Sequence, residues 1–234
     1  MSTDEEVRRR TELAEIAHRT YSAGYVAATD GNLSARLSDG TLLFTPTGCC
    51  LGEVEPDDFV HTDAAGRVLN LDRAVDHEPR NPTSEYLMHL AIYEERTDVC
   101  AVLHAHPPIA IGFSIAGISL ASCVIPEVVV GLGTIPTVPY TTPTTRATAE
   151  AVRPIIRRRD AIVLEHHGSV TVGATILQAF RKLEKVEHTA KILFVAHQLG
   201  SVRALAPEEV ERLLRMRETL GLPPLILGGG QGAR

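Results

Sequence analysis

Two histidines separated by a single residue give this chain its clearest chemical signal. His104 and His106 follow the apolar run 99–103, and side chains two residues apart in a strand project from the same face. Two imidazoles in this arrangement can bind one metal ion without distortion of the backbone, although half-buried histidines bonded to backbone groups give the same pattern. The spacing predicts a metal-binding pair at the end of a strand.

Two other parts of the sequence supply candidate ligands. A second apolar run, 161–164, is followed by His166, His167 and Gly168. Adjacent residues of a strand point to opposite faces, so only one of these two histidines can easily join the first pair. Glu85 begins an amphipathic segment, where an acidic residue also simply complements a helix dipole. Three imidazoles and a carboxylate suit zinc or a similar first-row divalent ion, which predicts a metal-dependent enzyme.

Three polar loops carry the groups of an anion site. Residues 28–34 precede a strand-like run, Thr45-Pro46-Thr47-Gly48 follows one, and Pro82-Thr83-Ser84 stands at a helix start. Hydroxyls, an amide side chain and free backbone N–H groups can together bind a phosphate. Each loop by itself is more typical of a turn or a cap. The remaining histidines fit ordinary surface or core positions: His18, His61, His77, His89, His188 and His197.

The elements that position these residues follow from periodicity and capping signals. Helices are expected over four stretches: 3–24, 83–96, 175–199 and from 207 onward. Strands are expected over four others: 32–37, 41–45, 99–106 and 161–164. Strands that lie between helices at both ends predict an α/β or α+β sandwich, in which helices cover a mostly antiparallel sheet.

The composition is that of an acidic protein with one core. The chain has 234 residues, 44% of them apolar, enough for one domain over 1–225 with a flexible glycine-rich tail over 226–234. A net charge of −6 argues against nucleic acid or an anionic membrane as a partner. No apolar stretch long enough for a membrane span or an export signal is present, and the four cysteines lack a Cys-x-x-Cys spacing. A cytoplasmic protein with free thiols is expected.

Five motifs occur in an order that resembles the class II aldolase/adducin family: Thr29-Asp30-Gly31-Asn32-Leu33-Ser34, Thr45-Pro46-Thr47-Gly48, Pro82-Thr83-Ser84-Glu85, His104-Ala105-His106 and His166-His167-Gly168. The resemblance covers roughly residues 8–200. It implies a three-layer α/β/α sandwich with a largely antiparallel central sheet. It also implies a homotetramer with active sites at subunit interfaces, like those of L-fuculose-1-phosphate aldolase and L-ribulose-5-phosphate 4-epimerase.

The resemblance also implies roles for individual residues. Four of them match the metal ligands of a Zn²⁺ site, which Mn²⁺ or Co²⁺ can also occupy: Glu85, His104, His106 and His167. Five match the residues that bind the substrate phosphate: Asn32, Thr47, Gly48, Thr83 and Ser84. Glu85 would also be the catalytic base. The implied reaction is aldol cleavage of a ketose 1-phosphate, such as L-fuculose 1-phosphate, to dihydroxyacetone phosphate and a short aldehyde through a metal-stabilised enediolate.

The sequence departs from the aldolase pattern at three places, of which one, Thr83 in place of a serine, keeps the hydroxyl and is harmless. Fuculose-phosphate aldolase protonates the aldehyde with a tyrosine of a neighbouring subunit, whereas the matching stretch 124–130 has none. Glu127 lies closest, either as a catalytic acid–base group or as a charged residue at a strand edge, and Tyr140 matches a different tyrosine that is expected to be structural. Asp30 replaces a small uncharged residue and would repel a phosphate unless it points away or pairs with Arg36.

These departures leave two alternatives to the aldolase. The first is a metal-dependent dehydratase or decarboxylase of the same family that uses Glu127 as its acid–base group. The second is a non-enzymatic assembly module like the head domain of adducin. Such a module need not retain metal ligands, whereas this chain retains all four.

Overall fold

The fold is organised around one seven-stranded sheet. The computed structural model describes residues 4–69 and 80–222. The strand order is β3-β2-β1-β4-β7-β6-β5, and every neighbouring pair is antiparallel except β5–β6. The strands have these bounds: β1 Asn32–Arg36, β2 Leu42–Phe44, β3 Val60–Thr62, β4 Ala101–Ala105, β5 Thr137–Val138, β6 Ala161–Leu164 and β7 Gly168–Gly173.

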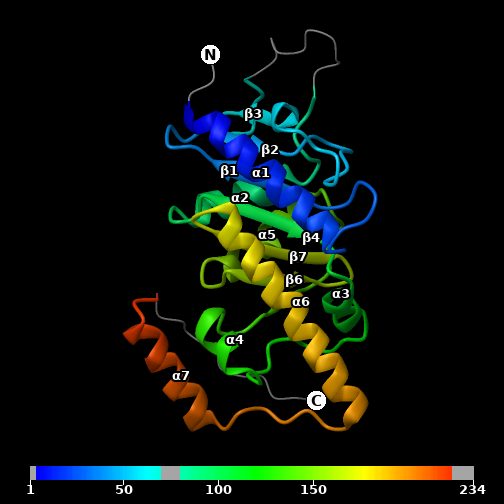
Figure 1. Cartoon of the computed structure of the whole chain (residues 1–234), viewed down its shortest axis with the longest axis vertical. Helices are drawn as coiled ribbons and strands as arrows, with labels where there is room; N and C mark the ends of the chain where they lie inside the picture. Colours follow the sequence, from blue (N-terminus) through cyan, green and yellow to red (C-terminus); the bar gives the residue numbers. More distant parts are fainter. Residues whose placement is uncertain (1–3, 70–79, 223–234) are drawn as a thin grey trace.

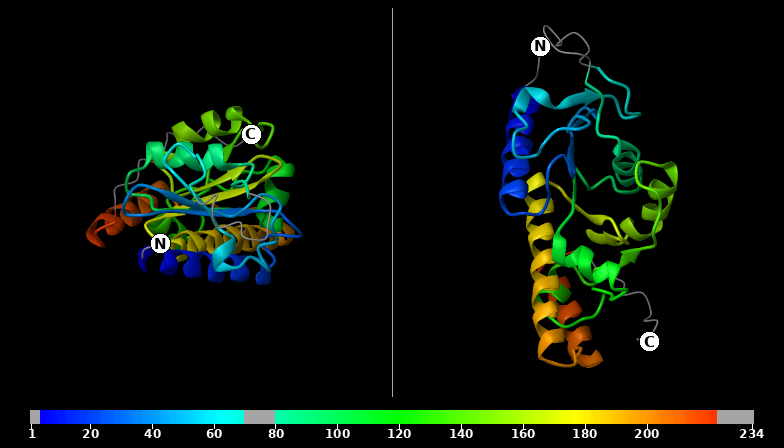
Figure 2. Two further views of the ribbon diagram at one scale, coloured as in Figure 1. Left: turned by 90° about the horizontal axis from the view of Figure 1, so that it is seen from above. Right: turned by 90° about the vertical axis from the view of Figure 1, so that its right-hand side faces the viewer.

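Helices cover both faces of the sheet (Figures 1 and 2). One face packs against α1 (Asp4–Ser22) and α6 (Ile176–Leu199), and the other against α2 (Tyr86–Glu95) and α5 (Arg146–Ile156). The remaining elements are α3 (Pro108–Ile115), α4 (Pro126–Gly131), α7 (Pro207–Thr219) and the short 3-10 helix η1 (Pro56–Asp58). This arrangement confirms the expected three-layer α/β/α sandwich with a largely antiparallel sheet.

Side-chain alternation in the two central strands determines which residues reach which layer. Leu33 in β1 and Leu103 in β4 are fully buried in the core shared with α1 and α6. Val102 belongs to the core on the opposite face, shared with α2 and α5. His104 and Asn32, which are paired across β1 and β4, continue this second set. Polar side chains of both strands are therefore directed toward the beginning of α2.

The four helices expected from the sequence correspond to α1, α2, α6 and α7, and the four strands to β1, β2, β4 and β6. At the start of α6, the hydroxyl of Thr175 accepts a hydrogen bond from Gln178 N at 3.2 Å, as its capping pattern predicts. Residue 3 and the tail 226–234 lie outside the described residues. Within the described ranges, all four cysteines are free, and no helix is long and apolar enough to cross a membrane.

One local prediction was wrong. The run Val128-Val129-Val130 favours a strand, yet it forms part of the helix α4. Pro126 occupies the first turn of this helix, where a missing N–H has no cost, and Val128 and Val129 are buried. Tertiary packing therefore overrides the local preference, and Glu127 lies in the first turn of a helix rather than on a strand edge.

Candidate metal centre and active site

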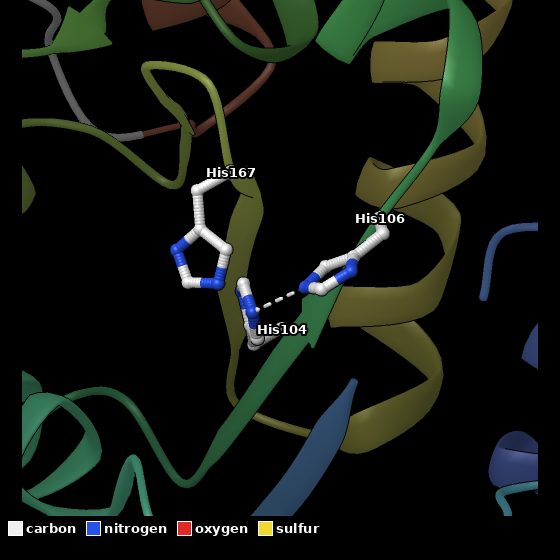
Figure 3. Close-up of side chains that lie close together, drawn as sticks. All are labelled: His104, His106 and His167. Atoms are coloured by element: carbon white, nitrogen blue, oxygen red, sulfur yellow. Dashed lines mark hydrogen bonds between the residues drawn. The ribbon is translucent and has the colours of Figure 1, made fainter. Parts of the chain in front are cut away.

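Three imidazole rings converge near the C-terminal end of β4 (Figure 3). One ring nitrogen from each of His104, His106 and His167 lies within 4.8 Å of the others. His104 Nε2 is 3.0 Å from His106 Nε2 and 3.1 Å from Glu85 Oε2, and His167 Nε2 is 3.7 Å from Glu85 Oε1. The structure thus brings the three predicted histidine ligands together, and Glu85 lies beside two of them.

The sheet and its flanking helices hold the first two histidines in place. His104 lies within β4, between paired positions of β1 and β7. His106 follows the last residue of the strand, and its N–H donates to Tyr25 O at 2.8 Å. The chain then enters α3, where the buried carboxylate of Glu187 accepts hydrogen bonds from the N–H groups of Ile109 and Ala110. This contact satisfies two free donors of the helix start and fixes the direction of the chain after His106.

His167 reaches the centre through the tight turn between β6 and β7. The strands pair at Leu164 and Gly168, and His167 N donates to Leu164 O at 3.1 Å. His166 has a φ of +56°, a left-handed conformation that is unfavourable for a residue with a side chain, and its N–H donates to Ser114 Oγ at 3.1 Å. Only one of the two adjacent histidines joins the pair, as expected, while the side chain of His166 is exposed.

Gly168 provides the space in which the rings meet. A Cβ atom at this position would lie 2.6 Å from Ala105 O, 2.8 Å from His104 Cε1 and 2.8 Å from His106 Cδ2. Contacts this short do not occur for real Cβ atoms, so any side chain would displace the rings or the strand pairing. The glycine of the His166-His167-Gly168 motif is therefore required by packing.

Hydrogen bonds on the outer side of two rings determine which nitrogen faces the centre. His104 Nδ1 lies 3.0 Å from Ser169 O, and a carbonyl can only accept, so Nδ1 carries the hydrogen. His106 Nδ1 lies 3.4 Å from the carboxylate of Asp30. The Nε2 atoms of both rings consequently face the centre, the arrangement that metal-binding histidines adopt with their outer partners.

The charges of the cluster are strongly coupled. Burial alone would raise the pKa of Glu85, but the charge of His104 and hydrogen bonds from His104 and Asn32 outweigh burial, so the pKa lies well below its ordinary value. Burial likewise lowers the pKa of His104, and the attraction of Glu85 reverses the sign and raises it. Burial and the nearby His104 lower the pKa of His106, and lower that of His167 to about 4.

These residues fit a divalent metal ion. Glu85 Oε1 is buried and has no hydrogen-bond partner. Burial of an unpaired polar atom costs about 1–3 kcal/mol, and burial of a charged one costs more. His104 Nε2 and His106 Nε2 are 3.0 Å apart, close to the roughly 3.3 Å expected between ligand atoms in a tetrahedral site with metal–nitrogen bonds of about 2.0 Å. The two oxygens of Glu85 lie 3.1 Å from His104 Nε2 and 3.7 Å from His167 Nε2, so a cation between the rings would have this carboxylate beside it.

Two of the polar loops lie side by side. Pro46 and Pro82 form a bridge, Thr83 N donates to Thr45 O at 2.9 Å, and Thr47 Oγ1 donates to Pro82 O at 2.6 Å. These bonds place Thr47 and Gly48 beside Thr83 and Ser84, as a shared role in phosphate binding would require. Thr47 and Gly48 line a cavity of about 600 Å³ that also includes Arg80.

Asn32 differs from the other residues predicted to bind phosphate. Its side chain is buried, with Nδ2 2.9 Å from Glu85 Oε2 and Oδ1 2.6 Å from His89 Nε2. Both ends of the amide are therefore engaged beside the metal centre. His89, expected at an ordinary core or surface position, is fully buried. Its bond to Asn32 was not predicted, although its position four residues after Glu85 places both on one helical face.

Asp30 does not pair with Arg36, one of the two arrangements expected to make its charge tolerable. The two residues lie at opposite ends of β1, and Arg36 instead donates to the backbone oxygens of Tyr93 and Arg96. Asp30 is directed toward His106. The negatively charged carboxylate of Asp30 thus lies beside the imidazole cluster.

Glu127 lies apart from the imidazole cluster, and Tyr140 lies at its margin. Glu127 is exposed on α4 and lines a cavity against α6, with Lys185 Nζ 3.3 Å from its backbone oxygen. None of the four predicted metal ligands is among the described residues that line this cavity. Tyr140, expected to be structural, is 56% exposed, and its ring centre is 6.4 Å from that of His166.

Comparisons with known proteins agree with this geometry. The sequence profile of the Class II Aldolase and Adducin N-terminal domain matches residues 11–194. A 3-oxo-tetronate 4-phosphate decarboxylase from Escherichia coli (strain K12) is 33% identical over 210 residues, which cover 87% of this chain and 94% of the relative. An L-fuculose phosphate aldolase from Methanococcus vannielii is 34% identical over 181 residues, which cover 77% of this chain and 93% of the relative.

The fold agrees as well. The solved structure of an L-fuculose 1-phosphate aldolase matches with a TM-score of 0.81 at 26% identity, and the match covers 95% of this chain and 99% of that one. Sequence profile, relatives and three-dimensional structure thus lead to one assignment: the chain belongs to the class II aldolase/adducin family and is a metal-dependent lyase.

Proposed function

We propose that this protein is a divalent-metal-dependent decarboxylase that acts on a phosphorylated 3-oxo sugar acid. The observation that carries the proposal is the convergence of three imidazoles, with Glu85 beside two of them and one of its oxygens buried without a hydrogen-bond partner. Zinc suits this set of three nitrogens and one oxygen best. When bound, it would supply a Lewis acid that draws electrons toward the substrate carbonyl as a carbon–carbon bond breaks.

Decarboxylation and aldol cleavage are closely related reactions for substrates of this kind. Loss of carbon dioxide from 3-oxo-tetronate 4-phosphate breaks the C1–C2 bond and moves its electron pair toward the C3 carbonyl. Cleavage of a ketose 1-phosphate breaks the C3–C4 bond and moves its electron pair toward the C2 carbonyl. Both reactions leave the enediolate of dihydroxyacetone phosphate, which then takes up a proton on carbon. The groups around the departing fragment determine which reaction is catalysed.

The surroundings of the departing fragment favour decarboxylation. Aldol cleavage needs a base that takes the O–H proton of the hydroxyl group on the carbon that becomes the aldehyde. Carbon dioxide leaves without such a proton transfer. The segment 124–130, which matches the position of the aldolase tyrosine, contains no tyrosine. The similarity to the Escherichia coli decarboxylase, over 87% of this chain, supports the same substrate class.

The residues of the chain would divide the remaining tasks. The three imidazoles and Glu85 would hold the metal. The proton that replaces carbon dioxide on carbon would come from water, and Glu85, which is ionised at rest, would take it up and pass it on. Thr47, Gly48, Thr83 and Ser84 would bind the phosphate through hydroxyl and N–H groups, and Asn32 would hold Glu85. Phosphate binding far from the reacting bond supplies the energy that orients the substrate.

Aldol cleavage of a ketose 1-phosphate such as L-fuculose 1-phosphate is the second candidate. The 34% identity to a Methanococcus vannielii L-fuculose phosphate aldolase supports it. In this case Glu127 would have to take the hydroxyl proton. Because Glu127 is exposed on α4, it would act in a neighbouring active site of the assembly.

We also propose a homotetramer with active sites at subunit interfaces. The C-terminal half of α6 carries apolar side chains that are 40–84% exposed: Ile192, Phe194, Val195 and Leu199. Exposed apolar residues grouped on one helix are typical of a subunit interface. Sedimentation velocity of the purified protein measures the number of subunits directly.

Product analysis tests the proposed reaction. The purified protein is treated with a chelator, reloaded with Zn²⁺, and incubated with 3-oxo-tetronate 4-phosphate or with L-fuculose 1-phosphate. Both reactions yield dihydroxyacetone phosphate, so carbon dioxide and aldehyde are measured separately. We expect carbon dioxide in a one-to-one ratio with dihydroxyacetone phosphate and activity that requires the metal. Faster aldehyde release from the ketose phosphate would support the aldolase instead. Absence of both carbon dioxide and aldehyde would contradict both candidates.

A further inference from the structure

A continuous row of buried polar groups extends from Glu85 into the core between α2 and β1. Successive members are joined by hydrogen bonds: Glu85 Oε2 to Asn32 Nδ2 at 2.9 Å, Asn32 Oδ1 to His89 Nε2 at 2.6 Å, His89 Nδ1 to Ser34 Oγ at 2.7 Å, and Ser34 Oγ to Tyr93 OH at 2.7 Å. Each of the five side chains belongs to a residue that is at most 8% exposed. Only the first member contacts the metal centre.

The periodicities of two elements build this row. Glu85, His89 and Tyr93 are spaced by four residues at the start of and along α2, so they share one helical face. Asn32 and Ser34 are spaced by two in β1 and share the face that is directed toward α2. Packing of α2 on β1 therefore brings the members of the row together, and regular helix and strand geometry is sufficient for it.

The chemistry of the groups permits one direction for the hydrogens. An ionised carboxylate can only accept, so Asn32 directs its NH₂ group to Glu85 and its oxygen to His89. His89 Nε2 must then carry a hydrogen, and Nδ1 of the neutral ring accepts from the hydroxyl of Ser34. The Ser34 oxygen in turn accepts from the Tyr93 hydroxyl. All four hydrogens point toward Glu85.

The environment of His89 supports the neutral ring. Its side chain is fully buried in an apolar layer, and burial followed by the charge of His104 lowers the pKa of His89 to about 3. A neutral imidazole has one N–H and one acceptor. The row uses both, with no donor or acceptor of the ring left over.

We propose that His89 is a positioning residue that sets the metal affinity of the centre through Asn32. The N–H of His89 fixes the Asn32 amide, and the amide holds the Glu85 carboxylate with Oε2 3.1 Å from His104 Nε2 and Oε1 3.7 Å from His167 Nε2. Without that N–H, the amide can turn its oxygen toward the carboxylate, which repels it. This inference rests on the proposed function, because it takes Glu85 as a metal ligand.

Three variants separate positioning from simple packing. His89→Leu removes the N–H, whereas His89→Gln places an amide nitrogen near the former Nε2 position and can still donate to Asn32. Tyr93→Phe removes a hydrogen bond at the far end of the row and leaves Ser34 able to donate to His89, so it is the matched control. The Zn²⁺ dissociation constant is measured by competition with a chromophoric chelator, together with the Tm of the metal-free protein.

We expect His89→Leu to weaken Zn²⁺ binding 10- to 100-fold, the range typical for loss of a group that orients a metal ligand. His89→Gln is expected to restore the affinity to within about threefold of the unchanged protein. Tyr93→Phe is expected to lower the Tm while its affinity stays within about threefold. A packing role alone would lower the Tm of both His89 variants and leave their affinities unchanged, which would overturn the inference.

Two results distinguish failure of this inference from failure of the proposed function. If the unchanged protein binds no divalent metal, both are wrong. If it binds Zn²⁺ and His89→Leu binds equally well, only the positioning role is wrong. Should His89→Leu fail to fold, long-range ¹H–¹⁵N spectra of the unchanged metal-free protein decide. A hydrogen on His89 Nε2 is expected, and one on Nδ1 would overturn the proposed direction of the row.

Discussion

Asp30 Oδ2 lies 3.4 Å from Nδ1 of His106, while Nε2 of the same ring faces His104 at 3.0 Å. The carboxylate therefore holds the hydrogen on Nδ1 and leaves the lone pair of Nε2 free for a metal. For His104, the backbone oxygen of Ser169 has the same role. An acidic residue that looked unfavourable beside a phosphate thus has an imidazole as its partner.

Asp30→Ala is expected to weaken metal binding about tenfold, because His106 loses the group that fixes its tautomer and orientation. The Asp30 side chain is 52% exposed, so the Tm of the metal-free protein is expected to stay nearly unchanged. Chelator competition gives the affinity and differential scanning fluorimetry the Tm. Asp57→Ala removes an exposed carboxylate elsewhere and is the control. Equal affinities of the two variants would contradict the role of Asp30.

His106→Ala is expected to remove the metal and lower turnover by at least about 100-fold while the fold remains intact. His106 follows the end of β4 and is only partly buried, with 22% of its side chain exposed, so its removal leaves the core unchanged. Metal content of the purified variant and circular dichroism measure the two effects. His166→Ala changes an exposed histidine beside the centre and is expected to retain the metal. Full activity of His106→Ala with metal still bound would refute the ligand assignment.

Gly168→Ala is expected to lower both stability and metal affinity. The added methyl group would lie 2.8 Å from carbon atoms of two imidazole rings and 2.6 Å from a backbone oxygen of β4. Such overpacking typically costs about 1–3 kcal/mol. Gly112→Ala is the control, since Gly112 is helical and a Cβ there meets no atom within 4 Å; it is expected to be neutral or slightly stabilising. Urea unfolding of the metal-free variants measures the free energy of unfolding. Unchanged stability of Gly168→Ala would contradict the packing argument.

Metal affinity is expected to fall as the pH decreases through the neutral range. Burial lowers the pKa of His104, but the attraction of Glu85 outweighs burial and raises it, so the metal must displace a proton from His104. Below the pKa of His104, each decrease of one pH unit is expected to weaken the apparent affinity for the metal about tenfold. Burial and the nearby His104 lower the pKa of His167 to about 4, so this ring has no proton to release near neutrality, and they lower the pKa of His106 as well. Calorimetry in buffers of different ionisation enthalpy counts the protons, and a pH-independent affinity would contradict this coupling.

Regular periodicities made most of the metal centre predictable. The alternation of a strand places His104 and His106 on one side. The same rule predicts that only one of His166 and His167 joins them, which is the observed outcome, although both stand in a turn in which His166 has a φ of +56°. The helical stretches with clear capping signals correspond to α1, α2, α6 and α7. In each case a local rule and the packing of the whole domain favour the same conformation.

The missed features depend on contacts that are distant in sequence. The chain positions Asp30 beside His106 and Asn32 beside His89 only after β1 has paired with β4 and α2 has packed on both. The helices α3, α4 and α5 are short, and α5 contains Pro154 in its last turn, so periodicity over one or two turns does not define them. Glu127 was misplaced for the same reason, because its segment forms a helix through burial of two valines.

The ligand atoms come from residues 85 to 167, and the last of them stands in the turn between β6 and β7. A growing chain on the ribosome therefore cannot complete the centre until more than two thirds of it has been synthesised and β7 has paired with β4. Metal loading is accordingly a late step of biogenesis.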